Sequence, residues 1–361
     1  MENTLVPKIH LSDWRGVLYV TGGGSPLLSD LLTVPGASST VLDARVPYSE
    51  SALEDATNQH LDQACSSAVA RSLAMQAFVK ANELEPGGKL FGLGVTASLA
   101  TNRMKKGKLR AYIGIQTAFK TQVTELFFPI GTSRIEQERL LTDTALQKLA
   151  SGLGIESSLA ANDSDLEANA TETLSMLLHE EPNYDGIPKS IFLPGSFNPL
   201  HSGHRRMKEM AEQTCGSKVQ YELCVRNIDK PPLDFLEIER LRDQFSKDEL
   251  VLTNVPKFKD KAILLAPSGN ATFVVGVDTL LRVVNTSYYR DDEELESTIA
   301  LFCSRNDRFL VFGRTIEDRS FATLDAVEIP EKLRHICVGF TEQQFRMDIS
   351  STDIRLRTSE S

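Results

Sequence analysis

Short apolar runs and amphipathic segments alternate along the second half of this chain, and this alternation is what most constrains its fold. The runs that suit buried strands lie at residues 190–193, 219–225, 250–253, 271–277 and 309–312. Helical periodicity between them predicts helices over residues 205–213, 235–245, 257–265 and 293–305. Regular alternation of this kind implies a parallel sheet with right-handed crossovers. Ligands of such sheets bind beyond the carboxyl ends of the strands.

The first half of the chain also mixes strands and helices. Strands are predicted at residues 16–20, 40–46 and 110–117. Helices are predicted at residues 27–33, 62–83 and 134–153. This pattern favours an α/β sandwich for the first half. The fold class expected for the chain is therefore α/β with two domains, the second built on a Rossmann-like parallel sheet.

An acidic stretch separates the two halves. Residues 151–189 hold eight acidic side chains, with Lys189 as the one positive side chain. The stretch ends in turn-forming residues at 181–186, and a short helix over 171–179 stays open. The sequence thus predicts a first domain over residues 1–153, an acidic linker over 154–188 and a second domain over 189–361.

Charge and composition make some classes of partner and location improbable for this protein. A formal net charge of −10 without a basic run disfavours nucleic acid, and no apolar run is long enough for a membrane span. Residues 1–14 mix charged with apolar side chains, unlike a secretory signal. Five scattered cysteines without a C-x-x-C pair favour buried or half-buried free thiols in a reducing compartment, here the cytoplasm, with the nucleus left open. They are Cys65, Cys215, Cys224, Cys303 and Cys337.

The turn after residues 190–193 carries the strongest chemical signal. It reads Gly195-Ser196-Phe197-Asn198-Pro199-Leu200-His201-Ser202-Gly203-His204, directly before a predicted helix. A strand, a glycine-containing turn and a helix start direct backbone N–H groups at one spot, which suits phosphate. Two imidazoles, His201 and His204, arrive at the same spot. A zinc site would need a third ligand, which the neighbouring sequence does not offer.

This turn resembles the first motif of the nucleotidylyltransferase superfamily. Residues 349–355, Ile-Ser-Ser-Thr-Asp-Ile-Arg, are similar to the superfamily's second motif, I-S-S-T-x-x-R. The resemblance implies transfer of a nucleotidyl group to a phosphate nucleophile, which needs charge neutralisation and alignment rather than a general base. It also implies catalytic roles for His201 and His204 and Mg²⁺ carried by the triphosphate, with no metal ligand from the protein. The residues that it implies for phosphate binding are Gly195, Ser196, Phe197, Gly203, Ser350, Ser351, Thr352 and Arg355.

The same turn looks closest to the nicotinamide or nicotinate mononucleotide adenylyltransferases. Residues 275–280, Val-Gly-Val-Asp-Thr-Leu, are similar to that family's G-x-D-x-L segment and place Asp278 at the nucleotide site, although a helix N-cap would also explain Asp278. Asn227, Lys230 and Arg314 are further candidates for substrate contacts. The proline-valine segment usual in that family after the second strand is missing, which leaves the acceptor in doubt.

The first half resembles the C-terminal domain of the CinA family, which includes amidases acting on nicotinamide mononucleotide. Three segments carry the resemblance: Thr21-Gly22-Gly23, residues 34–38 and residues 46–49. Tyr19, however, stands where the family has its serine nucleophile, and Leu53 stands near the expected lysine. The family's glycine-rich turn is replaced over residues 94–100. We expect a degenerate amidase fold in which Arg134 survives as a phosphate binder.

The leading functional hypothesis is transfer of AMP from ATP to nicotinamide or nicotinate mononucleotide, with release of pyrophosphate. Three alternatives stay open: cytidylyl transfer from CTP to another phosphorylated acceptor, a nicotinamide-nucleotide amidase, and a non-catalytic nucleotide-binding protein. The expected partners are the nucleoside triphosphate and a phosphorylated small molecule, with a homo-oligomer also open.

Overall fold

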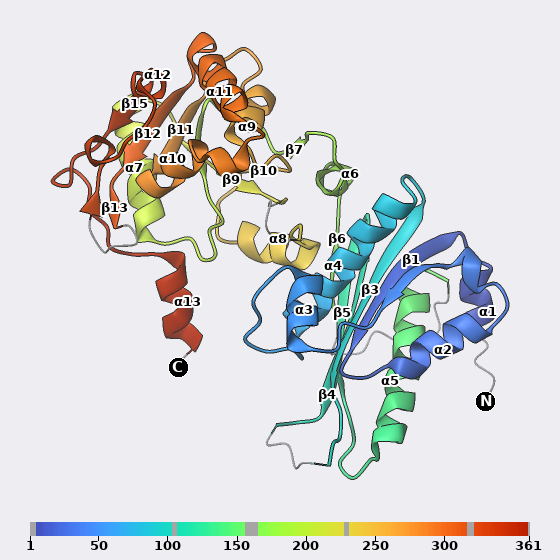
Figure 1. Ribbon diagram of the computed structural model, residues 1–361. Helices are drawn as coiled ribbons and strands as arrows, with labels where there is room; N and C mark the ends of the chain where they lie inside the picture. The colour runs from blue at the N-terminus through green and yellow to red at the C-terminus, as the bar shows by residue number, and fades with distance from the viewer. Residues whose placement is uncertain (1–4, 103–106, 156–164, 227–230, 316–320, 360–361) are drawn as a thin grey trace. The chain divides into compact units, whose positions relative to one another are not determined.

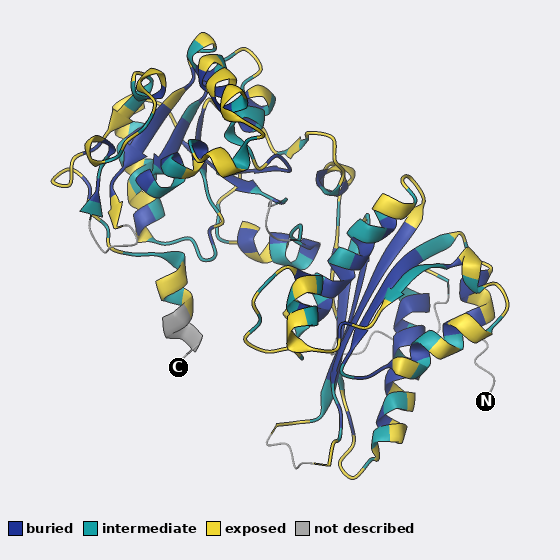
Figure 2. Ribbon diagram, viewed as in Figure 1, coloured by how far each residue is buried: buried dark blue, intermediate teal, exposed yellow. Residues whose placement is uncertain are grey.

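A computed structural model of the chain describes residues 5–102, 107–155, 165–226, 231–315 and 321–359. The chain divides into two compact units, each with its own sheet and buried core (Figures 1 and 2). Unit 1 comprises Met1–Ser175 and Asn227–Glu239, and unit 2 comprises Met176–Arg226 and Arg240–Ser361. The α/β fold class predicted from the sequence is confirmed in both units.

Unit 1 contains a mixed sheet whose described strands run in the order β2-β1-β3-β4-β5-β6. Strand β1 pairs in parallel with β2 and β3, and the remaining neighbours are antiparallel. The strands are β1 (Trp14–Thr21), β2 (Val41–Arg45), β3 (Lys89–Ser98), β4 (Arg110–Thr117), β5 (Lys120–Phe127) and β6 (Asp165–Asn169).

Helices cover both faces of this sheet. Figure 1 shows α4 on one side and α2 with α5 on the other. The helices of unit 1 are α1 (Leu5–His10), α2 (Ser25–Thr33), η1 (Ala37–Ser39), α3 (Glu50–Thr57), α4 (Ser67–Leu84), α5 (Arg134–Gly152) and α6 (Glu172–Ser175). Alternate residues of β4 serve the two sides: Tyr112 packs with Ala70 of α4, and Ile113 belongs to the core that contains α5.

Glycines bring α4 unusually close to the sheet. A Cβ atom on Gly92 would lie 2.0 Å from the carbonyl oxygen of Ala74, and one on Gly94 would lie 2.3 Å from that of Ala70. Gly114 faces the same carbonyl of Ala70, at 2.6 Å. The helix backbone therefore rests on strand backbone, which only glycine permits at these positions.

Unit 2 contains a sheet in the order β15-β12-β11-β8-β9-β10-β7 among the described strands. All neighbours are parallel except β7, which is antiparallel to β10. The strands are β7 (Tyr184–Asp185), β8 (Ile191–Pro194), β9 (Gln220–Cys224), β10 (Leu250–Thr253), β11 (Thr272–Gly276), β12 (Arg308–Phe312) and β15 (Cys337–Gly339). Strand order reverses between β8 and β11, which is the switch point of a doubly wound sheet.

The helices of unit 2 alternate with its strands along much of the chain. They are η2 (Met176–Leu178), α7 (Ser202–Cys215), the end of α8 (Phe235–Arg242), α9 (Phe258–Leu265), α10 (Val277–Val283), η3 (Thr286–Tyr288), α11 (Asp292–Ser304), η4 (Leu324–Ala326), α12 (Glu331–Arg334) and α13 (Ser351–Ser359). A separate ribbon pairs β13 (Arg314–Thr315) with β14 (Phe321–Ala322). Phenylalanines line the core: Phe273 packs against Phe192 and Phe309, with ring centroids 6.1 and 5.7 Å apart.

The structure departs from the sequence predictions in several places. The helix predicted from residue 62 begins at Ser67, because the Ser66 side chain accepts a hydrogen bond from the Val69 N–H and caps the helix there. Helix α3 and strands β3, β5 and β15 were not predicted. The segment predicted as a linker supplies β6 to the sheet of unit 1 and β7 to that of unit 2, because its backbone pairs with β5 in the first sheet and with β10 in the second.

The structure also bears on the predictions about the cysteines and about membrane spans. All five cysteines are free thiols, but Cys215 is exposed rather than buried because it ends α7 on its solvent side. In the described part of the chain, no helix has the length and apolar character needed to cross a membrane.

Candidate functional site

The turn that carries the first motif lies at the switch point of the unit 2 sheet, between β8 and α7. Gly195 continues the sheet by donating its N–H to the Glu222 carbonyl at 3.0 Å. A Cβ on Gly195 would lie 2.7 Å from the ring of Phe197, which is fully buried, whereas Ser196 is exposed. His201 then forms the N-cap of α7, and His204 lies in its first turn.

The two imidazoles stack on each other, with ring centroids 3.7 Å apart and planes 24° apart. The backbone N–H of His201 donates to Nδ1 of His204 at 3.3 Å. Since Nδ1 accepts, the proton of a neutral His204 ring sits on Nε2, which remains a donor. Gly203 leaves room for this arrangement, because a Cβ there would lie 3.0 Å from the His201 ring.

Both histidines are held neutral. Burial above all, together with the neighbouring His201 and the positive charge of Arg314, lowers the pKa of His204 to about 3. Burial also lowers the pKa of His201, again assisted by Arg314. At neutral pH the pair therefore consists of uncharged rings that can donate hydrogen bonds.

The second motif meets the first at this turn, although about 150 residues separate them. Ser351 donates its hydroxyl to the Pro199 carbonyl at 3.0 Å, and Arg355 donates to the Asn198 carbonyl at 2.5 Å. Thr352 accepts a hydrogen bond from Arg355 at 3.2 Å. Ser350 caps α13, because its hydroxyl accepts from the Asp353 N–H at 3.1 Å. The first turn of α13 thus contacts the loop that leads into α7.

Two further candidates, Asp278 and Arg314, meet at the ends of β11 and β12. Their side chains form an ion pair at 3.1 Å. The N-cap of α10 is Gly276, so the N-cap explanation of Asp278 is wrong: the carboxylate instead folds back over Gly276. Oδ1 of Asp278 and Nδ1 of His201 are both buried without a hydrogen-bond partner. Buried polar atoms without partners are rare and costly, which marks a place for a polar ligand.

Other sequence candidates fall elsewhere or went unnoticed. Asn227 and Lys230 lie outside the described residues. Gln244, which the sequence did not single out, bonds to the backbone of the motif loop at Phe197 and Leu200. Arg240 bonds to the side chain of Asn198 at 2.8 Å. Neither residue belongs to a recognisable motif, so only the folded arrangement identifies them.

Metal-binding chemistry is limited in the part of the chain that the structure describes. There, no group of three or more His, Cys, Asp or Glu side chains is arranged to hold a metal ion. Near the paired histidines the available carboxylate is that of Asp278, which already bonds to Arg314.

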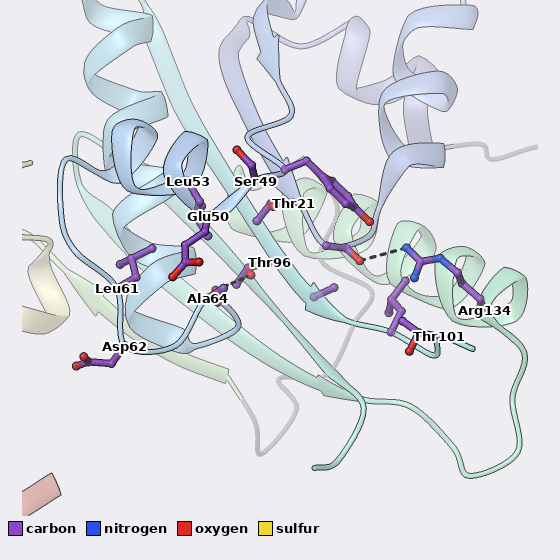
Figure 3. A pocket seen from close by; sticks show the side chains of 14 residues that line it. Thr21, Ser49, Glu50, Leu53, Leu61, Asp62, Ala64, Thr96, Thr101 and Arg134 are labelled. Carbon is purple, nitrogen blue, oxygen red and sulfur yellow. Dashed lines mark hydrogen bonds between the residues drawn. The ribbon is translucent and has the colours of Figure 1, made fainter. Parts of the chain in front are cut away.

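Unit 1 has a cavity of about 360 Å³ at the carboxyl end of β1 (Figure 3). Its lining combines hydroxyls, aliphatic side chains and three charged groups: Thr21, Gly22, Tyr48, Ser49, Glu50, Leu53, Leu61, Asp62, Ala64, Thr96, Ala97, Leu99, Thr101 and Arg134. The Arg134 guanidinium is engaged by the carbonyl oxygens of Gly22 and Ala100 and by Glu138. Its positive charge is thus already paired.

The residues that replace the amidase nucleophile and lysine do not supply that chemistry. Tyr19 is buried, and burial raises the pKa of its phenol, so the hydroxyl stays protonated. Leu53 presents an aliphatic side chain to the cavity. The hydroxyls of Thr21 and Thr96 donate to the carbonyls of Pro47 and Ala64, each at 2.8 Å. A serine-type attack needs a free nucleophile beside a base, and neither is found among these residues.

Residues 192–357, somewhat less than half of the chain, match the family model described as cytidylyltransferase-like. This match confirms the resemblance of the second half to nucleotidylyltransferases. No curated protein matched the sequence.

Solved structures that match the N-terminal part are CinA superfamily proteins. A protein of this superfamily from Klebsiella pneumoniae is 11% identical, with 42% of this chain and 95% of that chain covered and a TM-score of 0.35. The competence/damage inducible protein CihA from Agrobacterium tumefaciens is 17% identical, with 42% and 93% covered and a TM-score of 0.36. A competence or damage-inducible protein from Enterobacter asburiae is 12% identical, with 42% and 98% covered and a TM-score of 0.36.

Proposed function

We propose that unit 2 transfers a nucleotidyl group from a nucleoside triphosphate to a phosphorylated small molecule, with AMP from ATP and nicotinamide or nicotinate mononucleotide as the leading pair. The observation that carries this proposal is the meeting of both motifs on one loop: Ser351 and Arg355 bond to the carbonyls just before the stacked histidines. The groups that we propose for phosphate binding and the two imidazoles therefore lie at the switch point of a doubly wound sheet, which is where ligands of such sheets bind.

The chemistry follows from these groups. An oxygen of the acceptor phosphate attacks the α-phosphorus, a new P–O bond forms, and the bond to the pyrophosphate oxygen breaks. The acceptor phosphate is ionised at neutral pH, so no base has to remove a proton. The neutral rings of His201 and His204 would donate N–H hydrogen bonds to the phosphate oxygens on which negative charge develops in the transition state. Arg314, Arg355 and Ser351 would hold the triphosphate. Mg²⁺ would enter as the triphosphate complex.

Asp278 supports a role in binding the nucleotide or the acceptor. Its buried Oδ1 has no partner, so a ligand hydroxyl or amino group would complete its hydrogen bonding. The family description of residues 192–357 supports CTP as an alternative donor to ATP, with another phosphorylated acceptor.

The test is product formation by the purified full chain with Mg²⁺. ATP or CTP is combined with nicotinamide mononucleotide, nicotinate mononucleotide or other phosphorylated acceptors, and pyrophosphate and product mass are measured. We expect pyrophosphate with at least one pair, and its loss in His204→Ala. His335→Ala is the matched control, because His335 is an exposed histidine of the same unit. Absence of product with every pair would refute the proposal, and ammonia release from nicotinamide mononucleotide would favour the amidase.

A further inference from the structure

The loop that presents the two histidines follows a path that its own sequence does not favour. Phe197 has φ of +46°, a left-handed conformation that is unusual for a bulky residue. Its ring is fully buried and meets the His204 ring edge-on, with centroids 5.1 Å apart. Tyr221 and Phe245 pack on the same ring, at 5.2 and 5.4 Å. A backbone shift at Phe197 would therefore move the surface against which His204 rests.

Side chains from outside the loop hold its backbone at each residue from 197 to 200. Gln244 donates from Nε2 to the Phe197 carbonyl at 2.9 Å and accepts the Leu200 N–H at Oε1 at 2.8 Å. Between these two points, Arg355 and Ser351 donate to the carbonyls of Asn198 and Pro199. Gln244 is therefore the side chain that bonds to both the first and the last residue of this loop.

These holding groups differ in what they would do during the reaction. Ser351 and Arg355 are phosphate-binding candidates, so a bound triphosphate competes with the loop carbonyls for their donors. Gln244 is uncharged and half-buried in the turn after α8, and both ends of its amide are already matched to loop backbone. Its two bonds can persist when the donors of α13 turn to phosphate.

We infer that Gln244 is a positioning residue for nucleotidyl transfer: it fixes the 197–200 loop so that His201 and His204 stay aligned while Ser351 and Arg355 engage phosphate. This inference rests on the proposed function of unit 2. It concerns a residue that acts through the loop and does not itself touch the reacting atoms. Alignment of this kind accelerates a reaction strongly, and a misplacement of about 1 Å costs on the order of 100-fold in rate.

The test uses Gln244→Leu and Gln244→Glu in the full chain. Leucine removes both bonds to the loop, whereas glutamate keeps the acceptor for the Leu200 N–H and loses the donor to the Phe197 carbonyl. Both variants also lose the bond of Nε2 to the Leu241 carbonyl at 3.2 Å. We expect kcat to fall at least about tenfold in Gln244→Leu and less in Gln244→Glu, with KM for the triphosphate changed less than about threefold. An unchanged kcat in both variants would overturn the inference, as would a change confined to KM.

Gln220→Leu is the matched control. Gln220 also clasps backbone, accepting from the Lys189 N–H at 3.1 Å and donating to the carbonyls of Ile187 and Asp248 at 3.1 and 3.3 Å. It lies at the first residue of β9, the end of the strand remote from the site. Gln220→Leu should lower the thermal midpoint but keep kcat per folded molecule. If it lowers kcat as much as Gln244→Leu does, Gln244 acts on stability alone and the inference fails.

A second readout separates this inference from the proposed function. The imidazole C–H resonances of His201 and His204 are recorded by NMR without ligand and with Mg²⁺-ATP. Gln244→Leu should shift and broaden them, while Gln220→Leu should leave them in place. If the wild-type chain forms no product but the resonances respond in this way, the transferase proposal fails and the positioning of the loop stands. Resonances that are unchanged in Gln244→Leu would overturn the positioning.

Discussion

The backbone N–H of His201 donates to Nδ1 of His204 while the two rings stack 3.7 Å apart. One histidine thereby fixes the tautomer of the other and covers one of its faces. The pair behaves as a single neutral donor unit whose geometry depends on the turn between β8 and α7.

Removing either member of the pair should therefore cost nearly as much as removing both. We expect His201→Ala and His204→Ala each to lower kcat by roughly 100-fold, a magnitude typical of one lost transition-state donor. The double variant should be no more than a few-fold slower than the worse single variant, because residues that act as a unit are not additive. Steady-state pyrophosphate release from the three variants measures this. Strictly multiplicative losses would show that the rings act independently.

The depressed pKa of His204 predicts an acid-sensitive fold. In the unfolded chain this ring takes up a proton near its ordinary pKa of 6.5, whereas in the folded chain it does so near 3. The unfolded state thus binds more protons as pH falls below 6.5, so stability is lost in that direction and is constant above it. Between pH 6.5 and 5.5, the free energy of unfolding of unit 2 should fall by about 1 kcal/mol more in wild type than in His204→Gln. Urea titrations at both pH values give the difference, and equal losses would contradict the lowered pKa.

The charge of Arg314 should be measurable at both rings. It lowers the pKa of His201 and His204, so Arg314→Gln should raise both, which an NMR titration detects. The same change should raise KM for the triphosphate about tenfold or more, since a charged donor to phosphate is lost. Asp278→Asn is the companion variant: it removes the partner of Arg314 and keeps the shape of the side chain. Unmoved histidine titrations in Arg314→Gln would contradict the proposed proximity.

The glycine contacts beneath α4 predict a sharp steric limit in unit 1. A methyl group added at Gly94 would lie 2.3 Å from the Ala70 carbonyl, so the helix must lift from the sheet. We expect Gly94→Ala to destabilise unit 1 by about 3 kcal/mol, the upper range for overpacking. Gly107→Ala is the matched control, since nothing lies within 4 Å of the added atom. Thermal unfolding followed by circular dichroism distinguishes them, and equal midpoints would show that α4 adjusts without cost.

Much of this arrangement was predictable because its signals are local. The alternation after residue 190 predicted a parallel sheet, and the two motifs predicted His204 and Arg355 as neighbours in function. The bond between Arg355 and the Asn198 carbonyl joins the second motif to the loop of the first. Asp278 was ambiguous, since a carboxylate after a strand fits both an N-cap and a site; the structure excludes the N-cap, because Gly276 takes that position.

Gln244 illustrates what sequence alone does not reveal. Its neighbours along the chain form an ordinary helix end, and its partners Phe197 and Leu200 lie more than 40 residues earlier. A glutamine carries no charge or ligand chemistry that would distinguish it in a sequence. Strand β6 was missed for a similar reason, because its acidic residues lack an apolar alternation and are ordered by pairing with β5.

The sheet of unit 2 is bounded by its two shortest described strands, β7 with two residues and β15 with three. Strands this short leave few unpaired backbone groups with which a neighbouring copy could extend the sheet. Short edge strands of this kind limit edge-to-edge association of a hydrophobic parallel sheet.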